Sequence, residues 1–257
     1  MNGFKKSLVK DILMSAFYLL APKLGNRASI LMYHSVGDNP VFFTVSEANF
    51  RKQIQFLSSR NFTFQKLSTL LDNLRKGLSI NNVICLTFDD GYEDNFLNVL
   101  PLLKTYNIPA TIFLTTDSLE GLSPFSGLKM LSKKQIKEMH MSGLIEFMPH
   151  TRSHQKLTKL THEEMQKEIE ESRAIIESIT EVPAPIFSYP KGVYTQEIVS
   201  YLKQNKWNGA VTVKPGLVSL KSDPYLLPRN SIDSSTTFVQ FKTKVSKGIE
   251  YFSFLKG

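Results

Sequence analysis

The sequence has 257 residues, of which 42% are hydrophobic, and its 31 basic and 23 acidic side chains give a formal net charge of +8. This apolar content is enough for a sizeable core and argues against a disordered chain. The single cysteine, Cys85, lies in an apolar run and cannot form an internal disulfide, so no oxidising compartment is implied. Because the basic residues form no dense patch with interleaved aromatic side chains, nucleic acid is not an expected partner.

Residues 1–26 form a basic, apolar segment that we predict to be an amphipathic helix. Its apolar side chains recur at helical spacing: Phe4, Leu8, Ile12, Leu13, Phe17 and Leu20. The apolar stretch 12–21 is too short to span a bilayer, and it lacks a convincing cleavage site for a secretory signal. A helix lying on an anionic membrane surface and a helix packed on the domain's own core both remain open. An uncleaved signal-anchor is a third possibility.

Short apolar runs then alternate with helical patterns. They cover residues 28–32, 83–88, 110–114, 144–147, 186–188 and 210–213, and their continuous apolar character is typical of strands buried on both faces. Ser132 with Gln135, and Thr161 with Glu164, form capping boxes that predict helix starts. This alternation predicts an α/β fold with a parallel sheet. We favour a distorted (β/α) barrel in one domain, residues 27–257.

Polar side chains directly follow several of these predicted strands: His34, Asp89, Asp90, His150, His154 and Tyr189. In a β/α barrel the carboxyl ends of the parallel strands point to one face, where the loops build the site. We therefore expect these residues to converge although they are far apart in the sequence.

The pair His150 and His154 predicts a metal site. Histidines four residues apart can ligate one ion, and a carboxylate from another strand end would add an oxygen ligand. Two nitrogens and one oxygen leave coordination positions open, as catalytic zinc sites require. The same ligand set also suits Fe(II) oxygenases, so these residue types alone do not define the reaction.

Five segments resemble motifs of the polysaccharide deacetylases, also called NodB-homology proteins or carbohydrate esterase family 4. Residues 87–91 (TFDDG) and 150–154 (HTRSH) match the first two motifs. Residues 187–192 (FSYPKG) resemble the third motif in the form typical of poly-N-acetylglucosamine deacetylases, and residues 31–36 and 227–229 also look like that subgroup. The resemblance implies a distorted barrel of the NodB type and metal-assisted hydrolysis of an N-acetyl group.

The resemblance also implies a role for each matching residue. Asp90, His150 and His154 would bind a divalent metal ion, with zinc expected and other divalent transition metals as alternatives. Asp89 would be the general base, and Arg229 would position it. Tyr189 and Pro190 would bind substrate or the oxyanion, the latter through a backbone N–H near Tyr189.

The general acid is where the sequence departs from the common family pattern. The usual acid is a histidine late in the chain, but no histidine follows His162. In the poly-N-acetylglucosamine subgroup the corresponding histidine lies near the N-terminus, and His34 takes that place. A structural histidine at a strand end is the alternative for His34. Pro149 replaces the small residue more often found before His150.

The sequence thus predicts a metal-dependent hydrolase that removes N-acetyl groups from N-acetylhexosamine units. The expected substrate is a bacterial surface polysaccharide or its lipid-linked precursor. A catalytically silent glycan-binding member of the same fold at the membrane is the alternative. We expect a cytoplasmic protein or one peripheral at the inner face of the bacterial membrane, with a periplasmic or cell-surface location through an uncleaved signal-anchor as the alternative.

Overall fold

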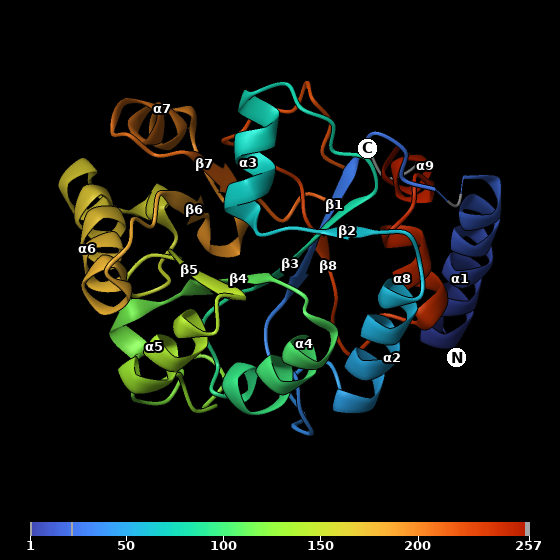
Figure 1. The fold of residues 1–257 in the computed structure, drawn as a ribbon, viewed down its shortest axis with the longest axis horizontal. Coiled ribbons are helices and arrows are strands. Elements are labelled where there is room, and N and C mark those ends of the chain that lie inside the picture. Colours follow the sequence, from blue (N-terminus) through green and yellow to red (C-terminus); the bar gives the residue numbers. More distant parts are fainter. Residues whose placement is uncertain (1, 22, 255–257) are drawn as a thin grey trace.

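The computed structural model describes residues 2–21 and 23–254, with side chains from 11 to 251 within them. Short strands lie at the centre and helices surround them (Figure 1). The strands are β1 (Ala28–Tyr33), β2 (Thr63–Phe64), β3 (Val83–Phe88), β4 (Ala110–Leu114), β5 (Ile145–Pro149), β6 (Ile186–Ser188), β7 (Gly209–Val211) and β8 (Asn230–Ser231). The α-helices are α1 (Asn2–Leu20), α2 (Glu47–Ser58), α3 (Leu67–Arg75), α4 (Leu100–Tyr106), α5 (Lys133–Met141), α6 (His162–Thr180), α7 (Gln196–Gln204), α8 (Phe238–Lys244) and α9 (Gly248–Phe254).

The strands form two parallel sheets that together make an incomplete ring. The larger sheet has the order β5-β4-β3-β1-β8, with β2 paired to the start of β3, and the smaller sheet pairs β6 with β7. A parallel bridge from Val211 to Leu227 links β7 to the segment that leads into β8. Strands β5 and β6 lie in contact without a hydrogen-bonded ladder. The predicted α/β fold with parallel strands is confirmed, and among the described residues the hydrogen-bonded ladders do not close into a complete barrel.

The continuous apolar runs located the strands well. The predicted strands 83–88, 110–114 and 186–188 match β3, β4 and β6, and the other three differ by one or two residues at one or both ends. Both predicted capping boxes are present, at the starts of α5 and α6. Strands β2 and β8 were not predicted, because each is two residues long and carries no apolar run.

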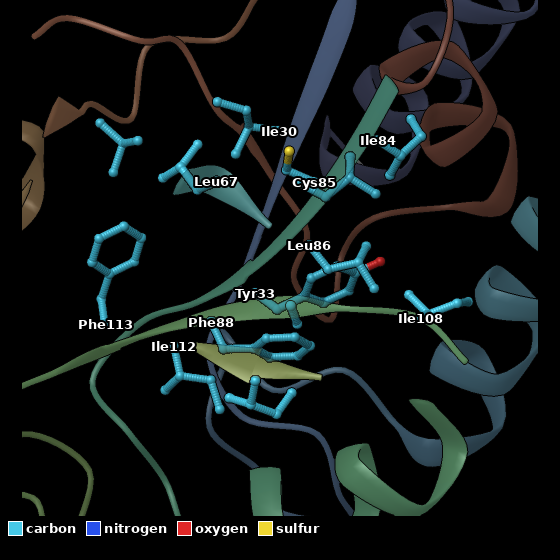
Figure 2. Packing of buried hydrophobic residues seen from close by; sticks show 14 of the residues in the cluster. Ile30, Tyr33, Leu67, Ile84, Cys85, Leu86, Phe88, Ile108, Ile112 and Phe113 are labelled. Carbon is cyan, nitrogen blue, oxygen red and sulfur yellow. The ribbon is translucent and has the colours of Figure 1, made fainter. Parts of the chain in front are cut away.

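The largest hydrophobic cluster lies around β1, β3 and β4. Figure 2 shows Tyr33 and Phe88 side by side there, with ring centroids 5.3 Å apart, and it shows Cys85 among apolar neighbours. Cys85, in one of these apolar runs, is fully buried. A second cluster, which includes Tyr189 and Trp207, packs α6 and α7 against β6 and β7. Because both clusters are close-packed, they hold the carboxyl ends of the strands in fixed positions.

Helix α1 packs against α8 and α9 at one side of the molecule (Figure 1). Met14 is fully buried, and Asp11 accepts hydrogen bonds from Thr237 Oγ1 (3.0 Å) and Gln240 Nε2 (2.6 Å). The helix is therefore tied to the domain through one face.

The opposite face of α1 leaves apolar side chains in solvent. Ile12, Leu13 and Leu20 of the predicted stripe are 61%, 41% and 76% exposed. The stripe positions Phe4 and Leu8 lie outside the side chains that the structure describes. Among residues 2–21 and 23–254, no helix combines the length and hydropathy that crossing a membrane requires. The division between residues 26 and 27 stays a prediction.

Candidate active site

A cavity of about 370 Å³ opens at the carboxyl ends of the strands. Its lining includes five of the residues singled out in the sequence: His34, Asp89, Asp90, His150 and His154. The other lining residues are Met32, Phe42, Phe43, Tyr92, Phe125, Lys191, Val213, Ser231 and Asp233. The expected convergence of strand ends is therefore present in the structure.

Asp90 directs one carboxylate oxygen toward the two histidines. Its Oδ2 accepts a hydrogen bond from the Tyr92 hydroxyl (3.0 Å), whereas Oδ1 is buried without a hydrogen-bond partner among the described residues. The backbone reaches this position through a left-handed conformation, with φ of 73° at Asp90 and 85° at Gly91. A Cβ at Gly91 would lie 2.4 Å from Leu114 Cδ2, so only glycine fits this turn.

His150 is oriented by the neighbouring strand. Its Nδ1 lies 2.8 Å from the backbone oxygen of Ser188, the last residue of β6. Since a carbonyl can only accept, Nδ1 carries the proton and Nε2 of the neutral ring is left with a free lone pair. Nε2 lies 3.8 Å from Asp90 Oδ1. This bond also joins β5 to β6 where the barrel has no ladder.

His154 completes the group from the loop after β5. Its Nε2 lies 3.6 Å from Asp90 Oδ1. Burial and the nearby His150 lower the pKa of His154 to about 4, despite the opposing effect of Asp90. The ring is therefore neutral at physiological pH, the form in which histidine binds metals.

The three side chains fit a metal ion. One ligand atom from each of Asp90, His150 and His154 lies within 4.8 Å of the others. Ligand atoms around a tetrahedral zinc ion with bonds of about 2.0–2.2 Å would be about 3.4 Å apart. The distances from Asp90 Oδ1 to the two Nε2 atoms, 3.8 Å and 3.6 Å, are near this value. The unpartnered Oδ1 of Asp90 is the kind of buried acceptor that an ion would satisfy.

Asp89 and Arg229 form a buried ion pair at the floor of this group. Arg229 is fully buried and donates to Asp89 Oδ1 (2.6 Å) and Oδ2 (2.7 Å), and further bonds to Thr87, Ser188 and Thr212 fix its guanidinium. Burial raises the pKa of the Asp89 carboxyl, but the attraction of Arg229 and His150 outweighs it and holds that pKa well below its usual range. Asp89 is thus ionised and held in one orientation.

His34 follows β1 and lines the same cavity. Its Nδ1 is buried without a hydrogen-bond partner among the described residues, and its ring lies 5.1 Å from that of Phe43. The Asn95 amide donates to the backbone oxygen of His34 (2.9 Å). The backbone is thereby anchored, while the ring is held by an aromatic contact.

Tyr189 and Pro190 are placed less favourably for their predicted role. The Tyr189 hydroxyl donates to the backbone oxygen of Tyr225 (3.1 Å), and its N–H donates to that of Val211 (3.3 Å). Both groups therefore serve the packing of β6 and β7. Lys191, with a left-handed φ of 58°, is the residue of this motif that lines the cavity. Oxyanion binding by Tyr189 or Pro190 stays a prediction.

Sequence reasoning missed several residues that build the site. Tyr92 lies two positions after Asp90, and this short spacing was a usable signal. Ser188 contributes a backbone oxygen, which no residue type reveals. Phe42 and Phe125, 71% and 55% exposed, flank the cavity from loops without a local pattern.

Comparisons with known proteins agree with this geometry. Residues 78–210 match the sequence model of the family described as polysaccharide deacetylase. The chain is 31% identical over 204 residues to YxkH of Bacillus subtilis (strain 168), whose name places it among the polysaccharide deacetylases, covering 78% of this chain and 69% of that protein. It is 29% identical over 195 residues to the poly-beta-1,6-N-acetyl-D-glucosamine N-deacetylase of Staphylococcus aureus (strain N315), covering 73% and 67%.

Solved structures show the same fold. A polysaccharide deacetylase from Bacillus cereus superposes with a TM-score of 0.74 at 27% identity, over 86% of this chain and 69% of that one. IcaB from Ammonifex degensii gives a TM-score of 0.76 at 20% identity, over 88% and 98%, which is evidence of fold alone.

The family match spans the aspartate pair, the two histidines and Tyr189, whereas His34 and Arg229 lie outside it. The predicted family and the predicted enzyme class, a carbohydrate N-deacetylase, are both confirmed. From the matched motifs, the relatives and the fold together, this chain belongs to the polysaccharide deacetylase family.

Proposed function

We propose that the protein is a metal-dependent hydrolase that removes N-acetyl groups from N-acetylhexosamine units of a bacterial surface polysaccharide or its lipid-linked precursor. The observation that carries the proposal is the convergence of Asp90, His150 and His154 beside an ionised Asp89 in one cavity. Poly-β-1,6-N-acetylglucosamine is the first polymer to test, because the Staphylococcus aureus relative is named for it.

Asp90 Oδ1 and the Nε2 atoms of His150 and His154 would hold the ion, with zinc as the expected metal. When bound, such an ion polarises the acetyl carbonyl and makes a water molecule more acidic. The chain's own residues orient these ligands: the Tyr92 hydroxyl holds Asp90, and the Ser188 carbonyl holds His150.

Asp89 is the proposed general base. It lies 3.9 Å from His150 Nε2, at the edge of the metal site, and Arg229 fixes both its oxygens. Each oxygen retains a lone pair, with which Asp89 can take the proton of an attacking water. Arg229 keeps the carboxylate ionised between turnovers and prevents it from rotating away.

His34 is the proposed general acid. The departing amine of the sugar needs a proton, and an imidazole that lines the cavity is a group that can supply it. Because its Nδ1 has no partner among the described residues, the ring is free of a bond that would oppose this role.

The proposal is tested by acetate release from β-1,6-linked N-acetylglucosamine oligomers. A chelator should abolish the activity of the purified protein, and added zinc or another divalent ion should restore it. The double variant Asp90→Ala/His150→Ala should lose at least about 10³-fold in rate, because ligand and orientation are lost together. Retained activity in that variant would refute the metal role. Binding of metal and sugar without acetate release from any polymer, oligosaccharide or lipid-linked sugar would favour the silent glycan-binding alternative.

A peripheral place at an anionic membrane surface, at the inner face of the membrane, is part of the proposal. The exposed side of α1 carries Leu19 and Leu20, each 76% exposed, and the cations Lys23 and Arg60 lie exposed nearby around a shared cavity. Apolar side chains beside cations suit a surface of anionic lipid. Flotation with anionic but not neutral vesicles, lost in Leu19→Ser/Leu20→Ser, is expected. A reporter fused after Gly257 would distinguish the inner face from a periplasmic or cell-surface location.

A further inference from the structure

The loop that carries both histidines leaves β5 in a conformation that is unfavourable for its residues. Thr151 and His154 have left-handed φ values of 66° and 59°. Such conformations are strained outside glycine, so they persist only where the surroundings impose them. Within the loop, Thr151 Oγ1 accepts the N–H of His154 (3.0 Å). This bond fixes the loop's shape but not its position relative to the rest of the protein.

Glu168, in the second turn of α6, binds this loop through hydrogen bonds from a separate element of the fold. Its Oε2 accepts the backbone N–H groups of Arg152 (3.0 Å) and Ser153 (2.9 Å), and its Oε1 accepts the Ser153 hydroxyl (2.8 Å). Hydrogen bonds to an ionised carboxylate are about twice as strong as neutral ones. Met165 and Ile169, on either side of Glu168 in the helix, are buried. Their packing fixes this part of α6 and therefore the position from which the Glu168 carboxylate reaches the loop.

A second link between loop and helix is weaker. The Arg152 guanidinium pairs with Asp117 and with Glu171, and all three side chains are substantially exposed. Exposed ion pairs contribute little, and this link ends on a long side chain instead of the loop backbone. Thr116 and Asp117 also donate backbone N–H groups to the carbonyl oxygens of Thr151 (3.3 Å) and Arg152 (3.0 Å). Glu168 is therefore the side chain that, together with these backbone bonds, places the segment between the two histidines.

We propose that Glu168 is a positioning residue that sets the metal affinity of the site by holding His150 and His154 at the separation the ion requires. The proposal rests on the metal role proposed above. Loss of the carboxylate frees the N–H groups of residues 152 and 153, and the loop can relax toward ordinary backbone angles. His154 would then leave Asp90, while His150 keeps its bond to Ser188.

The experiment measures zinc affinity of the full chain by competition with a chromogenic chelator. Glu168→Ala is expected to weaken binding about 10- to 100-fold, the usual effect of removing a group that orients metal ligands. Glu168→Gln keeps one acceptor oxygen but loses the charge, so we expect an intermediate loss of about 3- to 10-fold. Glu171→Ala is the matched control: it removes a carboxylate from the same helix that pairs with the side chains of Arg152 and Lys167 but with no backbone group of the loop. Its zinc affinity should stay within about twofold of wild type.

The outcomes separate the two proposals. If the wild-type chain binds no zinc or other divalent ion, the proposed metal role fails and this proposal falls with it. If wild type binds and Glu168→Ala binds equally well, only the role of Glu168 is overturned. An equal loss in Glu171→Ala would also overturn it, because charge near the loop would then suffice. Should Glu168→Ala not fold, wild-type affinity in Glu168→Gln would overturn the role of Glu168 in its place.

Discussion

The metal-ligand group and His34 face the same cavity, but they are held in different ways. Asp90 and His150 are each oriented by a hydrogen bond to a second polar atom, from the Tyr92 hydroxyl and to the Ser188 carbonyl respectively. His34 has a buried Nδ1 without a partner among the described residues, and its ring lies against Phe43. Two of the three proposed ligands are thus oriented by side-chain hydrogen bonds, whereas His34 is held by packing, as is the ring of the third ligand, His154, against Phe125.

This difference matches what each group must do. A metal ligand needs one fixed direction throughout the reaction, and outer hydrogen bonds supply it. A general acid gives up a proton and regains one in each turnover, so a permanent bond to one protonation state would hinder it. The comparison predicts that variants of the two groups will fail in different measurements.

The largest effect is expected at the carboxylate between the two groups. Asp89→Asn should lower kcat about 10³-fold, because the proton acceptor is lost while the shape of the side chain is kept. Zinc affinity should change only a few-fold, since Asp89 is not among the proposed ligands. Rates of acetate release and chelator competition on the same preparations measure the two quantities. An equal fall of both would place Asp89 among the metal ligands and remove the contrast.

A smaller and more selective effect is expected for His34. His34→Gln should lower kcat for the N-acetyl substrate about 10²-fold, because the amine then leaves without a proton donor. An aryl acetate releases a phenolate that needs no such proton, so its hydrolysis should fall less than about fivefold. Asp89→Asn serves as the control, because it should slow both substrates. Equal losses on both substrates in His34→Gln would assign His34 a structural role.

Much of the fold was predictable from the sequence, because β3 and β4 are continuous apolar runs with clear ends. Strand β8 was not, since Asn230 and Ser231 are polar and pair with β1 over only two residues. The apolar stripe of α1 was compatible with a membrane-facing helix and with a helix packed on the domain. Contacts with α8 and α9 bury Met14 and bind Asp11, whereas Ile12, Leu13 and Leu20 of the stripe stay exposed, a division that the sequence pattern did not indicate.

The site shows the same limit. Asp90, His150 and His154 were predictable because aspartate and histidine are common metal ligands and because all three residues follow predicted strands. Ser188 acts through its backbone oxygen, and Glu168 acts from a helix on backbone N–H groups. Sequence patterns reveal side-chain types and their local spacing. A residue that positions a distant residue through a backbone hydrogen bond produces no such pattern.

The smallest expected effect tests the backbone support beneath His34. Asp94 accepts hydrogen bonds from Ser35 Oγ (2.5 Å) and Asn95 Nδ2 (2.9 Å), and the same Asn95 amide holds the His34 carbonyl. Burial raises the pKa of the Asp94 carboxyl to about 6, against the opposing effect of these bonds. A carboxyl with a raised pKa in the folded state stabilises the protein below its unfolded pKa of about 4, and this contribution is lost as the pH rises through about 6.

The free energy of unfolding of the wild-type chain should therefore fall by about 2 kcal/mol between pH 4.5 and 7.5 relative to Asp94→Asn, which cannot ionise. Urea unfolding of the metal-free proteins at the two pH values gives this difference directly. Asp72→Asn, at an exposed aspartate of α3, is the control and should follow the wild type. A parallel pH dependence in wild type and Asp94→Asn would mean that Asp94 is ionised throughout. The backbone support of His34 would then be an ionised carboxylate, and the contrast between the two groups would be confined to the imidazole ring itself.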